Sequence, residues 1–155
     1  MKKKMCRKQF YGRLSIWLAF TALIIGAIAI TKMNIVLAIC YIIFLCVAPF
    51  AIAYFYCRKC PSIHGECPHG IFGKIAAKYR PAGNSDYTKA DIIATLLIII
   101  VLIAMAQFAL VHYIWMFIVY WALMVTAGAI IMVNLCPNCD NGKCPICIKL
   151  KKEKN

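Results

Sequence analysis

The sequence predicts an all-α integral membrane protein with four transmembrane helices, arranged as two tandem helical hairpins that are each followed by a cytoplasmic cysteine-rich loop. The first observation is composition: 64% of the 155 residues are hydrophobic and 15% are charged, where a soluble domain averages about 45–50% and about 25%. The second is that the apolar residues form long runs between basic segments. The third is that most cysteines gather in two short clusters. This pattern excludes a soluble globular protein.

The second hairpin is predicted over residues 92–134. No formally charged residue lies between Asp91 and Asp140. As one helix this stretch would be about 72 Å long, against a hydrocarbon core of about 30 Å, so the chain must fold back once. We expect the bend at His112 and Tyr113, with His112 solvated at the tip.

The first hairpin is predicted over residues 14–56, where two apolar runs are separated only by residues 31–34. Runs this long and continuous favour helices over the alternating strands of a membrane barrel. Ala27-Ile28-Ala29 also fits a signal-peptide cleavage site. We expect a retained helix, because the first run is longer than a usual signal core and a second run follows at once.

The basic residues predict the orientation. Residues 1–13 contain six Lys or Arg, residues 57–91 contain six and residues 135–155 contain five, which leaves only Lys32 on the other side. By the positive-inside rule, these two tails and the central loop are cytoplasmic, and a prokaryotic inner or plasma membrane is expected. The net charge of +13 then reflects topology and attraction to anionic lipid headgroups, and nucleic acid is not an expected partner.

Local patterns predict further details of the helices. Thr88 and Asp91 form a capping box that starts the third span. The pattern of residues 71–80 predicts a short interfacial helix that lies on anionic lipid headgroups. Small residues at helical spacing predict helix contacts along the first and, more weakly, the fourth span: Ala19, Ala22, Gly26 and Ala29, then Ala122, Thr126 and Ala129. An outer aromatic belt is expected at Tyr113, Trp115, Tyr120 and Trp121.

The C-terminal tail has the spacing of a thiolate metal site. It reads Cys136-Pro-Asn-Cys139-Asp-Asn-Gly-Lys-Cys144-Pro-Ile-Cys147. Asn-Gly favours a tight reversal, which would bring the two Cys-x2-Cys pairs face to face. Four thiolates suit one tetrahedral Zn²⁺, with Zn–S distances of about 2.3 Å, or a single iron.

The central loop offers a second ligand set. It reads Cys57-Arg-Lys-Cys60-Pro-Ser-Ile-His64-Gly-Glu-Cys67-Pro-His69. A site of three cysteines and one histidine would use Cys57, Cys60 and Cys67 with either His69 or His64. The same ligands would also suit iron or an iron–sulfur cluster, although zinc is expected first. Disulfides are disfavoured for both clusters, because cytoplasmic thiols are kept reduced in most organisms.

The cysteines also indicate an internal repeat. Cys57 and Cys136 are 79 positions apart, as are Cys60 and Cys139. Two copies of a unit of two spans and a cysteine loop would be related by a pseudo-twofold axis along the membrane normal. The two loops would then lie side by side, as neighbouring sites or as one site with shared ligands.

Three further cysteines have no assigned role. Cys46 has the helical spacing to lie on the same side as Cys57, which would suit a path for a soft metal or an electron. Buried cysteines are commonly just small apolar packing residues, and this is the simpler interpretation. Cys40 is in the same span. Cys6 would suit palmitoylation or have no role.

The layout resembles the four-helix membrane subunits of ferredoxin-type quinol dehydrogenases, which carry Cys-x3-Cys-Pro motifs after their second and fourth spans. Cys57-Arg-Lys-Cys60-Pro61 occupies the first place, with one residue fewer between the cysteines. Cys136-Pro-Asn-Cys139 occupies the second, without the following proline. No ferredoxin-like cysteine run follows. The resemblance implies electron transfer between a cytosolic donor and membrane quinone.

Three functions remain open. No nucleotide loop, Ser/His/Asp set or carboxylate pair is present, so an enzyme is not the first expectation. The leading hypothesis is a metal-stabilised membrane scaffold that docks a protein partner or a second copy of itself. The second is a redox protein with iron or iron–sulfur centres. The third is soft-metal transport or sensing through Cys46. The absence of charged residues from the middle of the spans disfavours an ion-coupled transporter.

Overall fold

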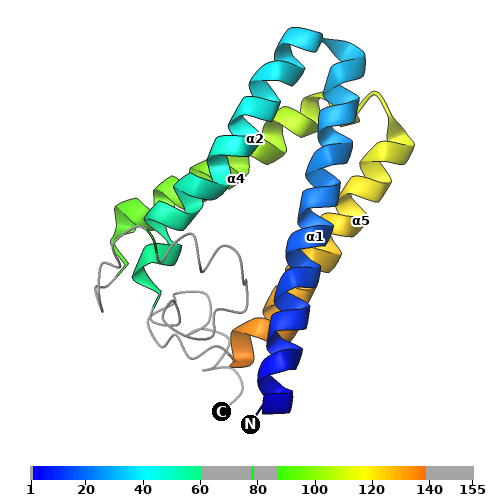
Figure 1. The fold of residues 1–155 in the computed structure, drawn as a ribbon. Helices are drawn as coiled ribbons and strands as arrows, with labels where there is room; N and C mark the ends of the chain where they lie inside the picture. Colours follow the sequence, from blue (N-terminus) through cyan, green and yellow to red (C-terminus); the bar gives the residue numbers. More distant parts are fainter. Residues whose placement is uncertain (1, 61–77, 79–86, 139–155) are drawn as a thin grey trace.

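The computed structural model describes residues 2–60, 78 and 87–138, and this part of the chain is helical, without strands (Figure 1). The four long helices are α1 (Lys2–Met33), α2 (Ile35–Phe55), α4 (Lys89–Leu110) and α5 (Ile114–Ile130). Short turns follow α2 and α5: η1 (Cys57–Lys59), η3 (Ile131–Leu135) and η4 (Cys136–Asn138). Each long helix provides all or most of a segment long and apolar enough to cross a membrane, and these segments are Gln9–Met33, Ile35–Lys59, Lys89–Leu110 and Ile114–Leu135. The all-α membrane class is therefore confirmed.

The break between α1 and α2 is made by a single residue. Asn34 leaves the helical conformation with φ −155° and ψ 118°, and its side chain accepts hydrogen bonds from the backbone N–H groups of Val36 and Leu37 at 2.9 and 3.2 Å. These donors would otherwise have no partner in the first turn of α2. Asn34 therefore ends one helix and caps the next.

Helix α4 begins and ends where the sequence predicts. Thr88 caps α4, and its capping box with Asp91 is present. The chain leaves α4 after Leu110 and begins α5 at Ile114, so the predicted bend at His112 and Tyr113 is confirmed. His112 is exposed there, as expected.

The four helices form two arms. α1 packs most extensively on α5, and α2 packs on α4, while α1 also contacts α2 and α4. In Figure 1 the arm of α1 and α5 diverges from the arm of α2 and α4. The turns at residues 34 and 111–113 lie at the end where the arms meet, which we call the turn end. The turns η1 and η4 lie at the other end, which we call the cysteine end.

All four helices meet at Gly26 of α1. A Cβ atom there would lie 2.9 Å from Ala106 Cβ on α4, 3.3 Å from Tyr41 Oη on α2 and 3.6 Å from Tyr120 Cε2 on α5. Ala22 and Ala29, one turn to either side, are fully buried. The first stripe of small residues is thus a helix contact as predicted, and glycine is needed at its centre for the close approach.

Two sequence predictions about α5 are wrong. The stripe of Ala122, Thr126 and Ala129 is exposed, and Tyr120, predicted to lie in an aromatic belt, is fully buried. The Thr126 hydroxyl donates to the Ala122 carbonyl at 2.6 Å, so it needs no partner on another helix. The face of α5 that packs is the one that carries Tyr120 and Ala127.

The buried residues repeat between the two halves of the chain. The buried residues of α1 other than glycine recur in α4 at an offset of 80 positions, and two of the four buried residues of α2 recur in α5 at an offset of 79. Asn34 and Tyr113, the residues before α2 and α5, are also 79 apart. The pairs of buried residues are Ser15 with Thr95, Ala22 with Leu102, Ala29 with Ala109, Ile30 with Leu110, Tyr41 with Tyr120 and Ala48 with Ala127.

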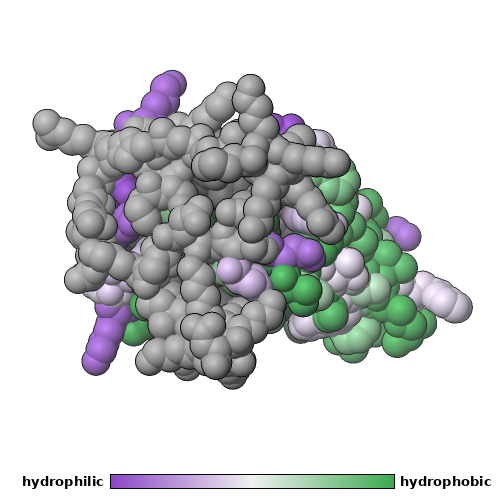
Figure 2. All heavy atoms as spheres, turned by 90° about the horizontal axis from the view of Figure 1, so that it is seen from below, coloured by the Kyte–Doolittle hydropathy of each residue, from purple (hydrophilic) through white to green (hydrophobic). Residues whose placement is uncertain are grey.

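The outer surface of the helices is apolar. At most 28% of the residues in any of the four spans are buried, and large side chains such as Phe108 and Val125 are more than 60% exposed. Figure 2, seen from the cysteine end, shows hydrophobic side chains on the outside of the bundle. Such apolar surfaces are suited to contact with lipid. Because lipid offers no hydrogen-bond partner to backbone N–H and C=O groups, it favours continuous helices.

We predict that Gly26→Ala destabilises the bundle, because the new methyl group would overlap Ala106 Cβ at 2.9 Å. Overpacking of this kind costs about 1–3 kcal/mol. Gly128→Ala is the matched control, since a Cβ at Gly128 meets nothing within 4 Å. Thermal unfolding in detergent measures the difference. Adding Ala106→Gly to Gly26→Ala should recover stability, and a Gly26→Ala variant as stable as the Gly128→Ala control would contradict the prediction.

Candidate metal-binding end of the helix bundle

The structure describes three of the nine predicted metal ligands, namely Cys57, Cys60 and Cys136, and all three belong to the cysteine end. The predicted interfacial helix 71–80 also falls outside the described residues except for Lys78, which is helical and exposed. The remaining predicted ligands lie outside the described residues: His64, Cys67, His69, Cys139, Cys144 and Cys147.

The first Cys-x2-Cys motif is a closed turn. After α2 the chain forms the 3-10 turn η1, and the Cys60 N–H donates to the Cys57 carbonyl at 3.0 Å. In a 3-10 turn the side chains at positions i and i+3 point in the same direction. The two half-buried cysteines therefore sit at positions that suit two ligands of one metal ion.

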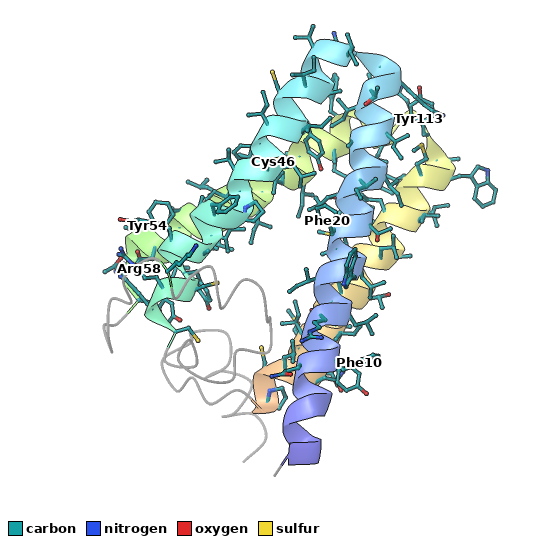
Figure 3. All side chains as sticks on the ribbon, in the orientation of Figure 1. Phe10, Phe20, Cys46, Tyr54, Arg58 and Tyr113 are labelled. Atoms are coloured by element: carbon teal, nitrogen blue, oxygen red, sulfur yellow. The ribbon has the colours of Figure 1, made fainter. Side chains whose placement is uncertain are left out.

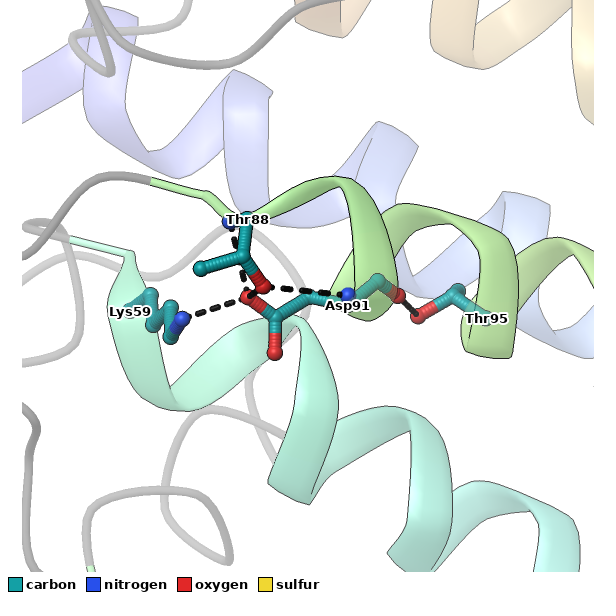
Figure 4. Close-up of polar contacts among 4 residues, drawn as sticks. All are labelled: Lys59, Thr88, Asp91 and Thr95. Atoms are coloured by element: carbon teal, nitrogen blue, oxygen red, sulfur yellow. Dashed lines mark hydrogen bonds and ion pairs between the residues drawn. The ribbon is translucent and has the colours of Figure 1, made fainter.

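A polar clamp ties this motif to the start of α4 (Figure 4). Lys59 Nζ donates to Asp91 Oδ2, and the same oxygen accepts from the backbone N–H and the hydroxyl of Thr88 at 2.9 and 2.6 Å. The Asp91 N–H donates back to Thr88 Oγ1 at 3.3 Å. The Lys59 and Asp91 side chains are only 11% and 13% exposed. Asp91 therefore completes the capping box of α4 and also pairs with Lys59, the residue before Cys60.

Aromatic contacts strengthen the same connection. The rings of Tyr56 and Tyr87 have centroids 4.8 Å apart, which links the end of α2 to the residue before the α4 cap. The Arg58 guanidinium lies over the Tyr54 ring, 4.3 Å from its centroid, and Figure 3 shows these two side chains together. Cation–π contacts of this kind orient the guanidinium. The first motif is thus attached to the arm of α2 and α4.

The second motif is attached to the other arm. α5 widens into the π-helical turn η3, which contacts α1 and leads directly into η4. Leu135 and Cys136 are buried, with 6% and 5% exposure. π-helical turns are rare and often occur at functional sites. Cys136 is consequently held against the arm of α1 and α5.

Within the described ranges, the structure shows no group of three or more His, Cys, Asp or Glu side chains that could hold a metal ion. Cys57, Cys60 and Cys136 therefore do not form a common site by themselves. Cys40 and Cys46 are exposed on the helix surface. Because Cys46 is exposed, it does not line the interior of the bundle. The structure therefore gives no support to a path for a soft metal or an electron from Cys46 to Cys57.

Sequence reasoning missed several polar features of this protein. The Lys59–Asp91 pair was detectable in principle, since Asp91 is the acidic residue nearest to the third span and the motif itself carries two bases. Within the spans, Trp121 Nε1 donates to Gln107 Oε1 at 3.2 Å. The buried hydroxyl of Tyr120 has no hydrogen-bond partner among the described residues.

Together these features define the class: an α-helical membrane protein with four spans and a cysteine motif after the second and the fourth. Comparison with protein-family models, with curated proteins and with solved structures finds no match to this chain.

We predict that the Lys59–Asp91 clamp stabilises the cysteine end, and that removing Asp91 costs more stability than removing Lys59. Lys59→Met should lower the free energy of unfolding by about 1 kcal/mol, the upper range for exposed ion pairs, because this pair is mostly buried. Asp91→Ala should cost more, since the hydrogen bonds that the Asp91 carboxylate accepts from the backbone N–H and hydroxyl of Thr88 are also lost, and an intramolecular hydrogen bond contributes about 1 kcal/mol.

Denaturation in detergent, followed by circular dichroism, measures both effects. Lys89→Met, an exposed lysine in the same turn, is the control. In the double variant the two losses should not add, because each substitution removes the same pair. Fully additive losses would show that the pair contributes nothing.

Proposed function

We propose that this chain is a metal-stabilised membrane scaffold whose cytoplasmic face is folded around thiolate sites, with zinc as the metal, and which docks a protein partner or a second copy of itself. One observation carries the proposal. Cys57 and Cys136 occupy equivalent positions in the two halves, 79 residues apart, and both follow directly on a span at the same end of the bundle.

Energetic reasoning supports a structural role for the metal. The segments 57–91 and 135–155 contain few large apolar side chains outside their cysteine motifs, so hydrophobic burial alone would stabilise them weakly. Metal binding to preformed or folding thiolate sites supplies about 10–16 kcal/mol in small zinc-binding peptides at neutral pH. The closed turn at Cys57–Cys60 fits the first half of such a ligand set.

The finer architecture belongs to the same proposal. We take α1 with α2 and α4 with α5 as two tandem hairpins related by a pseudo-twofold axis along the membrane normal. The helix contacts support this, because α1 on α5 and α2 on α4 are the two pairs that such an axis would make equivalent. The bases support a cytoplasmic cysteine end: Arg58, Lys59 and Lys89 lie there, whereas Lys32 lies at the turn end over the Tyr113 ring, 5.5 Å from its centroid.

The redox and transport hypotheses use the same cysteines and differ in measurable ways. Iron or iron–sulfur centres at these positions would pass electrons to membrane quinone. Soft-metal transport would need a path through the spans, and the exposure of Cys46 gives this hypothesis less support than the other two.

The metal content tests the proposal. Protein purified without oxygen should be colourless and contain zinc by elemental analysis, because zinc thiolates have no visible absorption. A coloured protein with charge-transfer bands and stoichiometric iron would support the redox hypothesis instead. A protein that contains neither zinc nor iron, and whose thiols react as free thiols, would overturn both the scaffold and the redox hypotheses.

Topology is tested independently of the metal. We predict that Asn34→Cys, placed at the turn end in a background whose native cysteines are replaced, reacts with a membrane-impermeant maleimide on intact cells. Lys89→Cys, at the cysteine end, should react only after the membrane is permeabilised. The reverse labelling pattern would place both cysteine motifs outside the cytoplasm and contradict the orientation.

A further inference from the structure

We infer that Arg58, whose guanidinium lies over the ring of Tyr54, binds the phosphate group of an anionic phospholipid at the cysteine end of the bundle. This inference concerns the lipid around the spans and does not depend on the proposed metal binding. Three properties of Arg58 carry it: its depth along the span, its position on the outer side of α2, and the hydrogen-bonding capacity of its guanidinium.

The length of α2 places Arg58 at the depth of the lipid headgroups. The 21 residues of α2 cover about 31 Å, at 1.5 Å per residue, which matches a hydrocarbon core of about 30 Å. Tyr54 lies at the end of this apolar run, where aromatic side chains commonly mark the membrane interface. Arg58 lies three residues beyond Phe55, the last residue of α2. It therefore falls within the headgroup layer, which is about 5–7 Å thick on each side.

Tyr54 also belongs to a row of outward-facing side chains on α2. Val47, Phe50 and Tyr54 are separated by three and four positions, which keeps them on one face of a helix, and they are 43–54% exposed. Arg58 follows Tyr54 by four positions, and its guanidinium carbon is 4.3 Å from the centroid of the Tyr54 ring. Figure 3 shows the two side chains together at the lower end of α2. The guanidinium is therefore on the lipid-facing side of the arm.

Arg58 and Lys59 are adjacent but differ in their partners. Lys59 pairs with Asp91, which is the only carboxylate among the residues that the structure describes. The Nε atom of Arg58 is buried and has no hydrogen-bond partner in the same described ranges. A guanidinium has five N–H donors and no acceptor, and a partly buried charge without a counter-ion is costly. An anion with several acceptor oxygens would satisfy Arg58.

The chemistry of a guanidinium favours phosphate as this anion. Its planar fork of N–H groups matches two phosphate oxygens at once, and phosphate is the anion that phospholipids carry at this depth. The contact with Tyr54 limits the positions that the guanidinium can take, which reduces the entropy lost on binding. Lys89 is exposed at the start of α4, which packs on α2. This additional positive charge favours an anionic headgroup over one that carries its own ammonium group.

Lipid titration of the full-length protein in detergent tests the inference. The protein is titrated with phosphatidylglycerol, with phosphatidylcholine of the same acyl chains, and with inorganic phosphate. Native mass spectrometry counts the bound lipids, and thermal unfolding measures the stabilisation that binding causes. We expect phosphatidylglycerol to be retained and to raise the unfolding midpoint. Phosphatidylcholine should bind more weakly, and inorganic phosphate at the same concentration should leave the midpoint unchanged.

Substitutions locate the binding site. Arg58→Gln should weaken phosphatidylglycerol binding by about tenfold or more, the equivalent of one charge-assisted hydrogen bond. Arg58→Lys should fall between the two, because it keeps the charge and loses the fork. Tyr54→Leu should cost about two- to fivefold, because the cation–π contact is lost, and Tyr54→Phe should cost less. Arg13→Gln is the matched control: it removes the same charge from an exposed position in the first span and should keep the affinity.

Three outcomes would overturn the inference. Equal losses in Arg58→Gln and Arg13→Gln would show general attraction to a basic surface instead of a site. Stabilisation by inorganic phosphate as large as that by phosphatidylglycerol would identify the ligand as free phosphate. Equal binding of phosphatidylglycerol and phosphatidylcholine by the unmodified chain would exclude selection of an anionic lipid, and this measurement does not depend on whether any variant folds.

Discussion

The close approach of four helices at Gly26 is the contact on which the rest of this structure depends. With no side chain at that position, α1 comes near enough to α4 for Ala106 to fill the remaining space, and the rings of Tyr41 and Tyr120 close the contact from α2 and α5. In lipid there is little hydrophobic gain from bringing helices together, so this packing supplies much of the association energy. Because the contact lies between the two halves of the chain, it determines how the halves are placed.

The main hydrophobic core of the bundle lies around this contact. Near it, residues such as Ala22, Ala29 and Leu110 are completely buried. Toward the cysteine end the two arms diverge, and polar and aromatic contacts there attach the first motif to the start of α4. The end that carries the cysteines is thus supported by each arm separately.

The repeat is not perfectly symmetric, because its two core tyrosines differ in hydrogen bonding. Tyr41 Oη reaches the Leu23 carbonyl at 3.5 Å, and it lies beside Gly26, where there is no methyl group. Its counterpart Tyr120 lies in a half that has Ala106 at the corresponding position, and its buried hydroxyl has no partner among the described residues. The two tyrosines, which correspond in the repeat, therefore differ in hydrogen bonding.

Much of the fold followed from residue patterns alone. Length and continuity of the apolar runs predicted four spans, Thr88 with Asp91 predicted the start of α4, and His112 with Tyr113 predicted the second turn, because these features depend on short-range hydrogen bonding and on burial from water. The cysteine spacing predicted the ligand types and the 79-residue repeat. Which face of α5 packs, that Tyr120 is buried and that Lys59 pairs with Asp91 were decided only by tertiary structure. In lipid, apolar and small residues are accepted on either face of a helix, so the sequence of a single span does not reveal its neighbours, whereas the geometry of the crossing does.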